Sequence, residues 1–325
     1  MKQRKALLVL FALALVFTMY SSLALAKPLT KKEAPGSIAY NHVTVLADDF
    51  GDRQAGTADE QNTQKYITSI FDQLGYNPSI QEFSFERNDQ EIDSSNVIAV
   101  KKGKFEQEII IGAHYDTVND VQGVDDNGSG VAVMLEVAER LQKAKPHYTI
   151  KFVAFGAEER GLQGSKYYVS RMSQEEADNT VAMINLDSLA AGDHMYVYGG
   201  AGEKGWVRDL ALDIAEKRKL DVNTNPGINE DYPAGTTGDW SDHAPFKNAG
   251  IPYAYFEATN WEIGALDGYT QTVKHGEIWH EPGKDTLEFI QTEFPGRMEN
   301  HLSTFSQLLT ELVLKINYGT VQKSN

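Results

Sequence analysis

Short apolar runs alternate with amphipathic helical segments along most of this chain, and this alternation limits the folds available to it. The helical segments fall at about Thr63–Leu74, Gly130–Lys143 and Gly296–Ile316. The apolar runs are Asn96–Val100, Glu108–Ala113, Ile150–Phe155, Thr180–Leu186, Met195–Tyr198 and Pro252–Phe256. Continuous apolar strands are typical of a sheet buried on both faces, with helices packed against it. The pattern therefore predicts an α/β fold around a mostly parallel sheet.

The N-terminal segment differs from the rest of the chain. Lys2, Arg4 and Lys5 precede a long apolar run that ends in Ala24-Leu25-Ala26. This order is typical of a secretory signal cleaved after Ala26, with an uncleaved membrane anchor as the alternative. We therefore expect a signal peptide at 1–26, a linker or short pro-segment at 27–36, and a single domain at 37–325. The expected location is secreted or periplasmic, with no membrane attachment after cleavage.

The charge of the chain limits its possible partners, and its cysteine content limits what can stabilise it. The 325 residues include 30 Lys and Arg against 46 Asp and Glu, which gives a net charge of −16. A strongly acidic chain is repelled by nucleic acid and by anionic membranes, so neither is expected as a partner. The chain has no cysteine, so disulfides cannot contribute to its stability.

Acidic or imidazole side chains follow three of the predicted strands. His114 and Asp116 end the first, the adjacent Glu158 and Glu159 follow the second, and Asp187 ends the third. In open α/β sheets the ligand sites lie at the edge formed by the carboxyl ends of the parallel strands, which is where these side chains are expected. Residues two apart in an extended segment share a face, so Asp116 is expected to orient the His114 imidazole.

The stretch GVDDNGSG, residues 123–130, adds two neighbouring carboxylates ahead of a predicted helix. Crowded carboxylates raise the cost of ionising one another unless cations lie among them. A pair of divalent metals meets this need, because one carboxylate can bridge two ions while imidazoles and other carboxylates complete each coordination sphere. Of the adjacent glutamates, one can ligate while the other acts as general base. Spacing does not decide whether Asp125 or Asp126 is the bridge.

Five segments occur in an order that resembles the M28 family of co-catalytic zinc peptidases. They are GAHYDT, GVDDNGSGVAVMLEVA, FGAEERGLQGS, INLDS and SDHAPF, and the likeness extends from about Arg53 to Asp285. The resemblance implies a three-layer α/β/α sandwich around a mixed, mostly parallel sheet, with two Zn²⁺ per chain. It assigns one zinc to His114, Asp126 and Asp187, and the other to Asp126, Glu159 and His280. It also implies that Glu158 is the general base and that Asp116 orients His114.

Two parts of the pattern depart from the family. The segment IWHEPGKDT resembles the closing histidine segment and favours His280 over His275 and His243, although one extra residue separates His280 from Asp285. Gly238 and Trp279 stand where some relatives place a tyrosine that polarises the scissile carbonyl. Tyr253 and Tyr255 are the substitutes that the sequence offers. The aromatic side chains expected at the pocket rim are Tyr232, Trp240, Trp261 and Tyr269.

These features together predict a secreted zinc aminopeptidase that acts on peptide or protein N-termini. A site rich in carboxylates suits a protonated α-amine, whereas a substrate carboxylate would require arginine. Arg160, beside the glutamates, supports a carboxypeptidase or dipeptidase alternative. A single-zinc glutaminyl cyclase and a non-catalytic binding protein are further alternatives, and cobalt or manganese could replace zinc.

Overall fold

The computed structural model describes residues 33–322, which contain a seven-stranded sheet with helices on both faces. The strands are β1 (Ser79–Arg87), β2 (Gln90–Lys101), β3 (Phe105–His114), β4 (Tyr148–Phe155), β5 (Thr180–Leu186), β6 (His194–Gly199) and β7 (Tyr253–Thr259). The helices are α2 (Ser37–Val45), α3 (Ala58–Gln73), α4 (Gly130–Leu141), α5 (Gln163–Arg171), α6 (Gln174–Asn179), α7 (Trp206–Arg218), α8 (His243–Asn248), α9 (Leu287–Glu293), α10 (Arg297–Lys315) and α11 (Tyr318–Gln322).

The sheet is mixed, with four parallel strands at its centre. Its order is β1-β2-β4-β3-β5-β7-β6, in which β4, β3, β5 and β7 run parallel, while β1, β2 and β6 join through antiparallel pairs. Parallel neighbours require crossover connections, and the helices between these strands supply them. The mixed, mostly parallel α/β sheet predicted from the sequence is confirmed.

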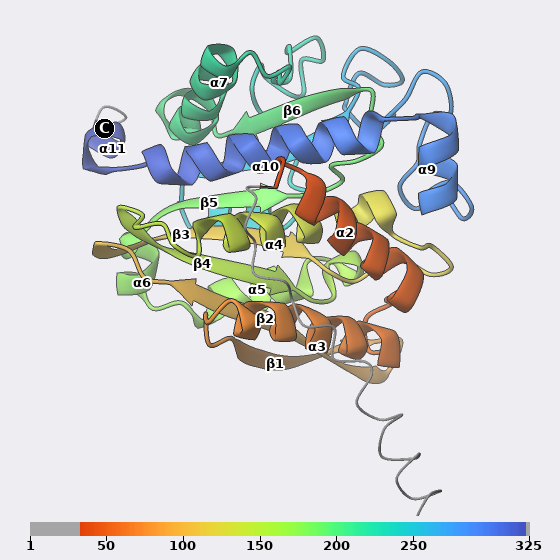
Figure 1. Cartoon of the computed structure of the whole chain (residues 1–325), viewed down its shortest axis with the longest axis horizontal. Helices are drawn as coiled ribbons and strands as arrows, with labels where there is room; N and C mark the ends of the chain where they lie inside the picture. The colour runs from red at the N-terminus through yellow and green to blue at the C-terminus, as the bar shows by residue number, and fades with distance from the viewer. Residues whose placement is uncertain (1–32, 323–325) are drawn as a thin grey trace, which may run out of the picture. The chain divides into compact units, whose positions relative to one another are not determined.

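Two apolar layers cover the sheet. Ile109 and Ile111 of β3 point into the larger layer, which contains buried residues of α2, α3, α4, α7 and α10. Figure 1 views this side, with α4 and α10 in front of the strands. Ile110 points to the opposite side, where it joins Tyr168 of α5 and Phe246 of α8. Successive residues of a strand point to opposite faces, so a strand segment covered on both sides must be apolar at consecutive positions, as Ile109–Ala113 of β3 is.

The apolar-run pattern did not predict β1. Of its nine residues only Phe83 is buried, because β1 is an edge strand whose other side chains are at least partly exposed. Its sequence, SIQEFSFER, therefore lacks the continuous apolar character of the central strands. β2 also extends well beyond the predicted Asn96–Val100, since its first half pairs only with β1.

The predicted signal, residues 1–26, lies outside the described residues, as do 27–32 of the predicted linker. The linker's last residue is held by the fold: the Gly36 amide donates to Glu136 Oε1 at 2.8 Å, and the Ala39 amide donates to Oε2 at 2.7 Å. Contacts group the described residues from Ala34 onward into one compact unit. Within residues 33–322, no helix is both long and apolar enough to span a membrane.

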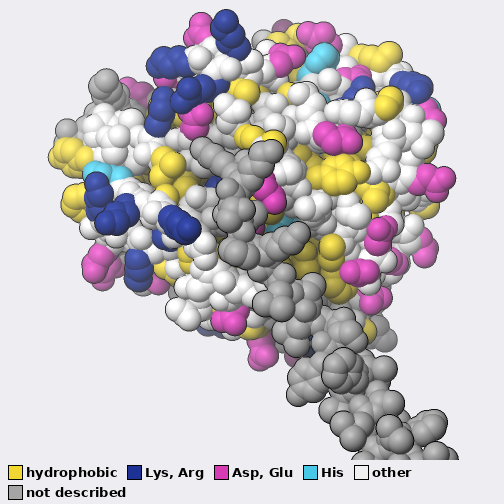
Figure 2. Space-filling view, viewed as in Figure 1, with side chains coloured by type: hydrophobic (Ala, Val, Ile, Leu, Met, Phe, Trp, Pro, Cys, Tyr) yellow, Lys and Arg dark blue, Asp and Glu magenta, His cyan; other side chains and the backbone are white. Residues whose placement is uncertain are grey.

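The parallel strands bring the predicted site residues to one edge of the sheet. His114 is the last residue of β3 and pairs with Phe155, the last residue of β4. Asp187 follows directly after the end of β5, and its amide donates to the Phe256 carbonyl of β7 at 3.1 Å. On the face shown in Figure 2, acidic side chains are dispersed and many basic ones gather over α7.

Candidate metal centre and active site

The five predicted metal ligands converge into two groups that share Asp126. His114, Asp126 and Asp187 form one group, and Asp126, Glu159 and His280 form the other; within each group the ligand atoms lie within 4.8 Å of one another. His114 Nε2 lies 3.0 Å from Asp126 Oδ1, and His280 Nε2 lies 3.1 Å from Asp126 Oδ2. Asp126 thus directs one carboxylate oxygen into each group, which is the arrangement that a bridging ligand requires.

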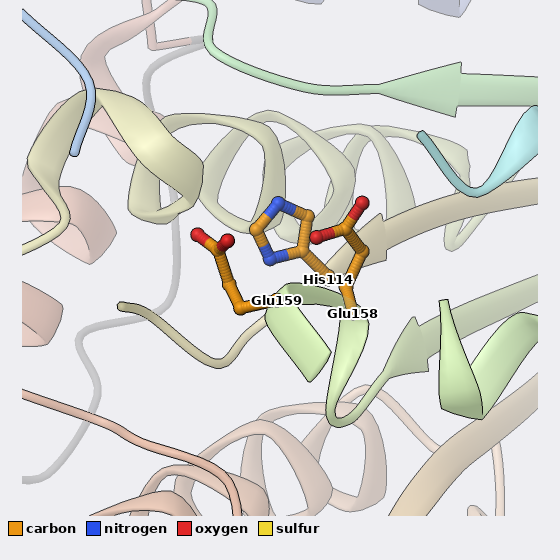
Figure 3. Close-up of side chains that lie close together, drawn as sticks. All are labelled: His114, Glu158 and Glu159. Atoms are coloured by element: carbon orange, nitrogen blue, oxygen red, sulfur yellow. The ribbon is translucent and has the colours of Figure 1, made fainter. Parts of the chain in front are cut away.

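Asp187 and Glu159 are the remaining carboxylates of the two groups, and the two histidines differ in their exposure to solvent. Asp187 Oδ1 lies 3.4 Å from His114 Nε2, and Glu159 Oε2 lies 3.3 Å from His280 Nε2. His114 is 1% exposed, whereas the His280 side chain is 43% exposed, so the second group opens toward solvent. Figure 3 shows the imidazole of His114 between the carboxylates of Glu158 and Glu159.

The residues present fit a metal pair. Asp126 Oδ1 and Glu159 Oε1 are buried and have no hydrogen-bond partner among the described residues. The 3.0 Å approach of His114 to Asp126 Oδ1 is therefore a close contact without a hydrogen bond, as occurs between two ligands of one cation. Buried polar atoms are normally satisfied, so unpartnered oxygens call for an ion. Imidazole and carboxylate donors suit zinc.

The electrostatics of the site also call for positive charge. Burial raises the pKa of Glu158 well above its usual range and raises the pKa of Glu159 to about 7. The carboxylates of Asp126 and Glu159 raise the pKa of His280 to about 12. A nearby cation favours the ionised form of a carboxylate, so bound metal would relieve the cost of keeping these acids together.

The neighbours Asp125 and Asp126 have different roles. The Asp125 carboxylate accepts hydrogen bonds from the amides of Ala190 and Ala191 and from the side chain of Gln271. It anchors the loop that follows Asp187, while Asp126 alone enters the two ligand groups. The turn begins at Gly123, which has φ 62° and whose Cβ, if present, would lie 2.2 Å from the Thr117 side chain.

Asp116 makes its shortest contacts to the glutamate turn rather than to His114. Its carboxylate accepts the amide of Glu158 at 2.9 Å and that of Glu159 at 3.2 Å. The distance from its Oδ1 to His114 Nδ1 is 3.6 Å, longer than the 3.2 Å between that nitrogen and the Asp116 backbone oxygen. Asp116 therefore positions both glutamates as well as facing the imidazole predicted to be its partner.

Asp285, from a distant part of the sequence, holds the turn that carries Asp126. Its carboxylate accepts the amides of Asp125 at 2.6 Å and Asp126 at 3.1 Å, and it is fully buried. The sequence shows only that Asp285 follows His280 by a few residues. Its supporting role was not predicted, because the amides that it accepts lie about 160 positions away.

We expect Asp285→Ala to weaken metal binding about 10- to 100-fold, because residues that orient metal ligands typically contribute that much. The change leaves two buried amides without acceptors and loosens Asp126. Zinc affinity is measured by competition with a chromophoric chelator. Asp213→Ala, which removes an exposed carboxylate on α7, is the control. Equal affinity in both variants would contradict the role given to Asp285.

A small pocket opens beside the two ligand groups, with a volume of about 120 Å³. This is well below the ~300–1,000 Å³ of drug-sized ligand sites, so it suits a single terminal residue. Its lining comprises His114, Asp126, Glu158, Glu159, Asp187, Ser188, Trp240, Tyr255, Glu257, Gly268, Tyr269, Trp279 and His280. Trp240 and Tyr269, predicted at the rim, line it. Tyr232 and Trp261 lie outside this lining and pack edge to face, with ring centroids 5.7 Å apart.

The alternative histidines lie outside the ligand groups. His243 is buried, its Nε2 lies 3.0 Å from the Gly238 carbonyl, and its ring packs on Tyr255. His275 pairs with Glu293 Oε2 at 2.7 Å. Both are therefore engaged in contacts unrelated to the ligand groups.

The hydroxyls of the two tyrosines considered for polarising the scissile carbonyl already donate hydrogen bonds within the protein. Tyr253 donates its hydroxyl to the Gly199 carbonyl, and Tyr255 donates to Glu257. Neither hydroxyl is free to polarise a scissile carbonyl. The indole nitrogen of Trp279, by contrast, is buried and has no partner among the described residues.

Comparison with known proteins agrees with this geometry. The model of peptidase family M28 matches residues 96–306. The alkaline phosphatase isozyme conversion protein of Escherichia coli (strain K12) is 36% identical over 87% of this chain and 91% of its own length. Aminopeptidase YwaD of Bacillus subtilis (strain 168) is 35% identical over 62% of this chain, which spans only 41% of that protein.

Solved structures share the fold. A zinc aminopeptidase from Bacillus subtilis superposes with a TM-score of 0.71 at 21% identity, covering 88% of this chain and 97% of the other. The glutaminyl cyclase of Porphyromonas gingivalis superposes with a TM-score of 0.66 at 22% identity, covering 86% and 98%. At such identities the likeness establishes the fold alone. The family match and the Escherichia coli relative together establish that this chain belongs to peptidase family M28.

Proposed function

We propose that this M28 peptidase is an exported aminopeptidase that holds two zinc ions and uses Glu158 as its general base. The observation that carries the proposal is the convergence of two ligand groups on one shared carboxylate, with a further carboxylate outside both groups, Glu158, beside His114. A single-metal site would need only one of these groups.

His114, Asp126 and Asp187 would hold one zinc ion, and Asp126, Glu159 and His280 the other. When bound, such a pair polarises a carbonyl and lowers the pKa of water to about 7. The donor set also accepts cobalt or manganese, so zinc is proposed on the chemistry of the ligands and on the family.

Three features support Glu158 as the group that moves the proton between the attacking water and the departing amine. It lines the pocket, is 8% exposed, and its amide is held by Asp116, which sets the turn from which its side chain projects. Its raised pKa, caused by burial, suits a group that accepts a proton from the attacking water and delivers it to the departing amine. Asp242, buried in the SDHAPF segment, adds to that raised pKa by its charge.

The charge of the pocket favours a substrate amine over a substrate carboxylate. Among the described residues, no lysine or arginine lines the pocket. Arg160 instead donates to Asn119 Oδ1 at 2.7 Å and to Gln54 Oε1 at 3.4 Å. The arginine that would support a carboxypeptidase is therefore committed elsewhere, and the acidic pocket suits a protonated N-terminus.

The direct test compares peptides with free and acetylated N-termini. We expect stepwise release of the first residue from the free peptide and at least about a hundredfold slower cleavage of the blocked one, since blocking removes a charged contact and adds bulk in a small pocket. Amino-acid release is followed by mass spectrometry. Equal cleavage of both peptides, or release from the C-terminus, would refute an aminopeptidase. Formation of pyroglutamate from N-terminal glutamine would support a cyclase instead.

Export is proposed on the sequence alone, from the basic start, the apolar run and the Ala24-Leu25-Ala26 pattern. Intact mass of the protein recovered outside the cytoplasm is expected to correspond to a chain that begins at Lys27. A full-length mass would contradict cleavage at that position.

A further inference from the structure

The end of the molecule opposite the candidate site carries a cluster of basic and apolar side chains. Three segments meet there: the β2–β3 turn with the start of β3 at 102–106, the α4–β4 loop at 143–147, and the stretch at 314–318 where α10 ends and α11 begins. The Phe105 amide donates to the His147 carbonyl at 3.0 Å, and the Tyr318 amide donates to His147 Nε2 at 3.4 Å. His147 therefore joins the three segments into one surface, which we call the lysine patch.

The lysine patch is basic although the chain as a whole is acidic. Its exposed lysines are Lys102, Lys104, Lys143, Lys145 and Lys315. Its three segments contain one acid, Glu106, and among the described residues none of the five lysines forms an ion pair. The basic side chains over α7 differ, because Lys217 pairs with Asp213 and Arg218 pairs with Glu311. The patch therefore keeps a local positive charge that the net charge of −16 conceals.

Exposed apolar side chains lie among these lysines. Phe105 is 50% exposed, Leu314 is 43% exposed and Tyr318 is 62% exposed. Single exposed apolar residues are common, but a group of them rimmed by charged residues marks an interaction surface. Figure 2 shows hydrophobic, basic and histidine side chains together at the end of the molecule where Figure 1 places α11. The patch thus offers a partner both charge and apolar contact.

These two features together fit the surface of a bilayer that contains anionic lipid. Clusters of about four to eight lysines or arginines attract such a surface, and aromatic side chains enter it at the level of the headgroups. A soluble polyanion would contact the lysines but leave Phe105 and Tyr318 in water. A long polyanion such as nucleic acid would also meet the acidic remainder of the chain, whereas a flat surface touches only this end. The observations therefore favour a membrane over a soluble polyanion.

The position of the patch sets the orientation of a docked molecule. β3 begins at Phe105 in the patch and ends at His114 in the candidate site, and ten residues of a strand span about 30 Å. β4 repeats this arrangement, because it starts directly after His147 and ends at Phe155, shortly before Glu158. The patch and the pocket therefore lie at opposite edges of the sheet, and a molecule held by the patch keeps its pocket turned toward solvent.

We propose that the lysine patch docks this protein reversibly on membranes that contain anionic lipid, with the pocket facing away from the bilayer. The acidic net charge predicted no such partner, because net charge averages over the whole surface. At physiological ionic strength, charges more than about 8 Å from the bilayer are largely screened, so the end that touches it decides the sign of the interaction. The inference concerns where the protein is held and does not rest on the aminopeptidase proposal.

The test measures sedimentation of the zinc-loaded protein with vesicles of phosphatidylcholine alone and of an equal mixture of phosphatidylcholine and phosphatidylglycerol. We expect binding to the mixed vesicles only, and weaker binding as salt is added. Lys102→Glu combined with Lys104→Glu should lower the partition coefficient about 10- to 100-fold, because each lysine beside an anionic surface contributes roughly fivefold. Phe105→Ser should lower it about 3- to 10-fold at unchanged charge, through the lost apolar contact.

Two controls accompany these variants. Lys217→Glu combined with Lys219→Glu makes the same change of charge on α7 and should bind as the wild type does. Melting temperatures equal to that of the wild type show that each variant is folded. The orientation is measured by quenching of tryptophan fluorescence with brominated phosphatidylglycerol. Phe105→Trp should add a quenched tryptophan, whereas Tyr269→Trp, at the pocket, should add an unquenched one.

Each contrary result contradicts a defined part of the proposal. Wild-type binding to both kinds of vesicle alike, or to neither, would overturn membrane docking. Equal binding by the Lys102 and Lys104 double variant and by the α7 control would remove the patch from the interaction. Binding of heparin in preference to mixed vesicles, undiminished in Phe105→Ser, would assign the patch to a soluble polyanion instead. Quenching in Tyr269→Trp but not in Phe105→Trp would overturn the orientation.

Discussion

Glu158→Gln is expected to lower kcat about 10²- to 10⁴-fold, the range that general acid–base catalysis typically contributes. The substitution keeps the size of the side chain and removes its ability to accept a proton. Glu158 is in neither of the groups that share Asp126, so bound metal should remain. Kinetics on an N-terminally free peptide, together with elemental analysis of the same sample, measure both quantities.

Glu159→Gln is the matched control for this change. Glu159 adjoins Glu158 in the chain but belongs to the group that contains His280. We expect this variant to lose metal from that group, whereas Glu158→Gln keeps its metal and loses turnover. Wild-type hydrolysis by a metal-loaded Glu158→Gln protein would exclude Glu158 as the base.

Removal of metal is expected to reduce activity by at least about 10³-fold, because metal ions contribute several kcal/mol of transition-state stabilisation and each 1.36 kcal/mol is tenfold in rate. The chelated protein should also melt at lower temperature. Metal that binds only the folded state stabilises it, and its removal leaves the carboxylates of Asp126, Glu159 and Asp187 close together without cations. Activity assays and thermal melts before and after dialysis against a chelator measure both effects.

Adding back zinc should restore activity at about two ions per chain, the number that the two ligand groups would hold. Asp126→Asn, treated in the same way, should not recover, because its carboxylate is the one shared by both groups. A metal-free protein with full activity would refute the metal site. Recovery with one ion per chain would favour the single-zinc cyclase over the peptidase mechanism.

Much of the fold could be predicted from local sequence, for a physical reason. The central strands β3, β4 and β5 have long segments buried on both faces, so these segments are largely apolar and easily recognised. The edge strand β1 has one buried side chain, Phe83, and therefore carries no such signal. Helix α10 was predicted to within one residue at each end, because its apolar residues recur at intervals of three and four.

The candidate site was predictable for a related reason. Parallel strands end at one edge of the sheet, so His114, Glu158, Glu159 and Asp187 could be placed together from their positions after apolar runs. His280 and the choice of Asp126 came from resemblance to a family, since neither periodicity nor spacing distinguishes them. The structure brings the five predicted ligands into two groups and places Glu158 in the lining of the same pocket.

The sequence by itself determined the sheet, its chemistry-bearing edge and the family, because each of these depends on residues that are close along the chain. Resemblance to a family favoured Asp126 over Asp125, but only the tertiary structure gave the physical reason, which is that Asp125 accepts the amides of Ala190 and Ala191 some 65 positions away. Only the tertiary structure showed that Glu257 lines the pocket; in the sequence it is one acidic residue in an otherwise largely apolar strand. What a buried carboxylate does depends on which donors and cations surround it, and residues distant in sequence supply that environment.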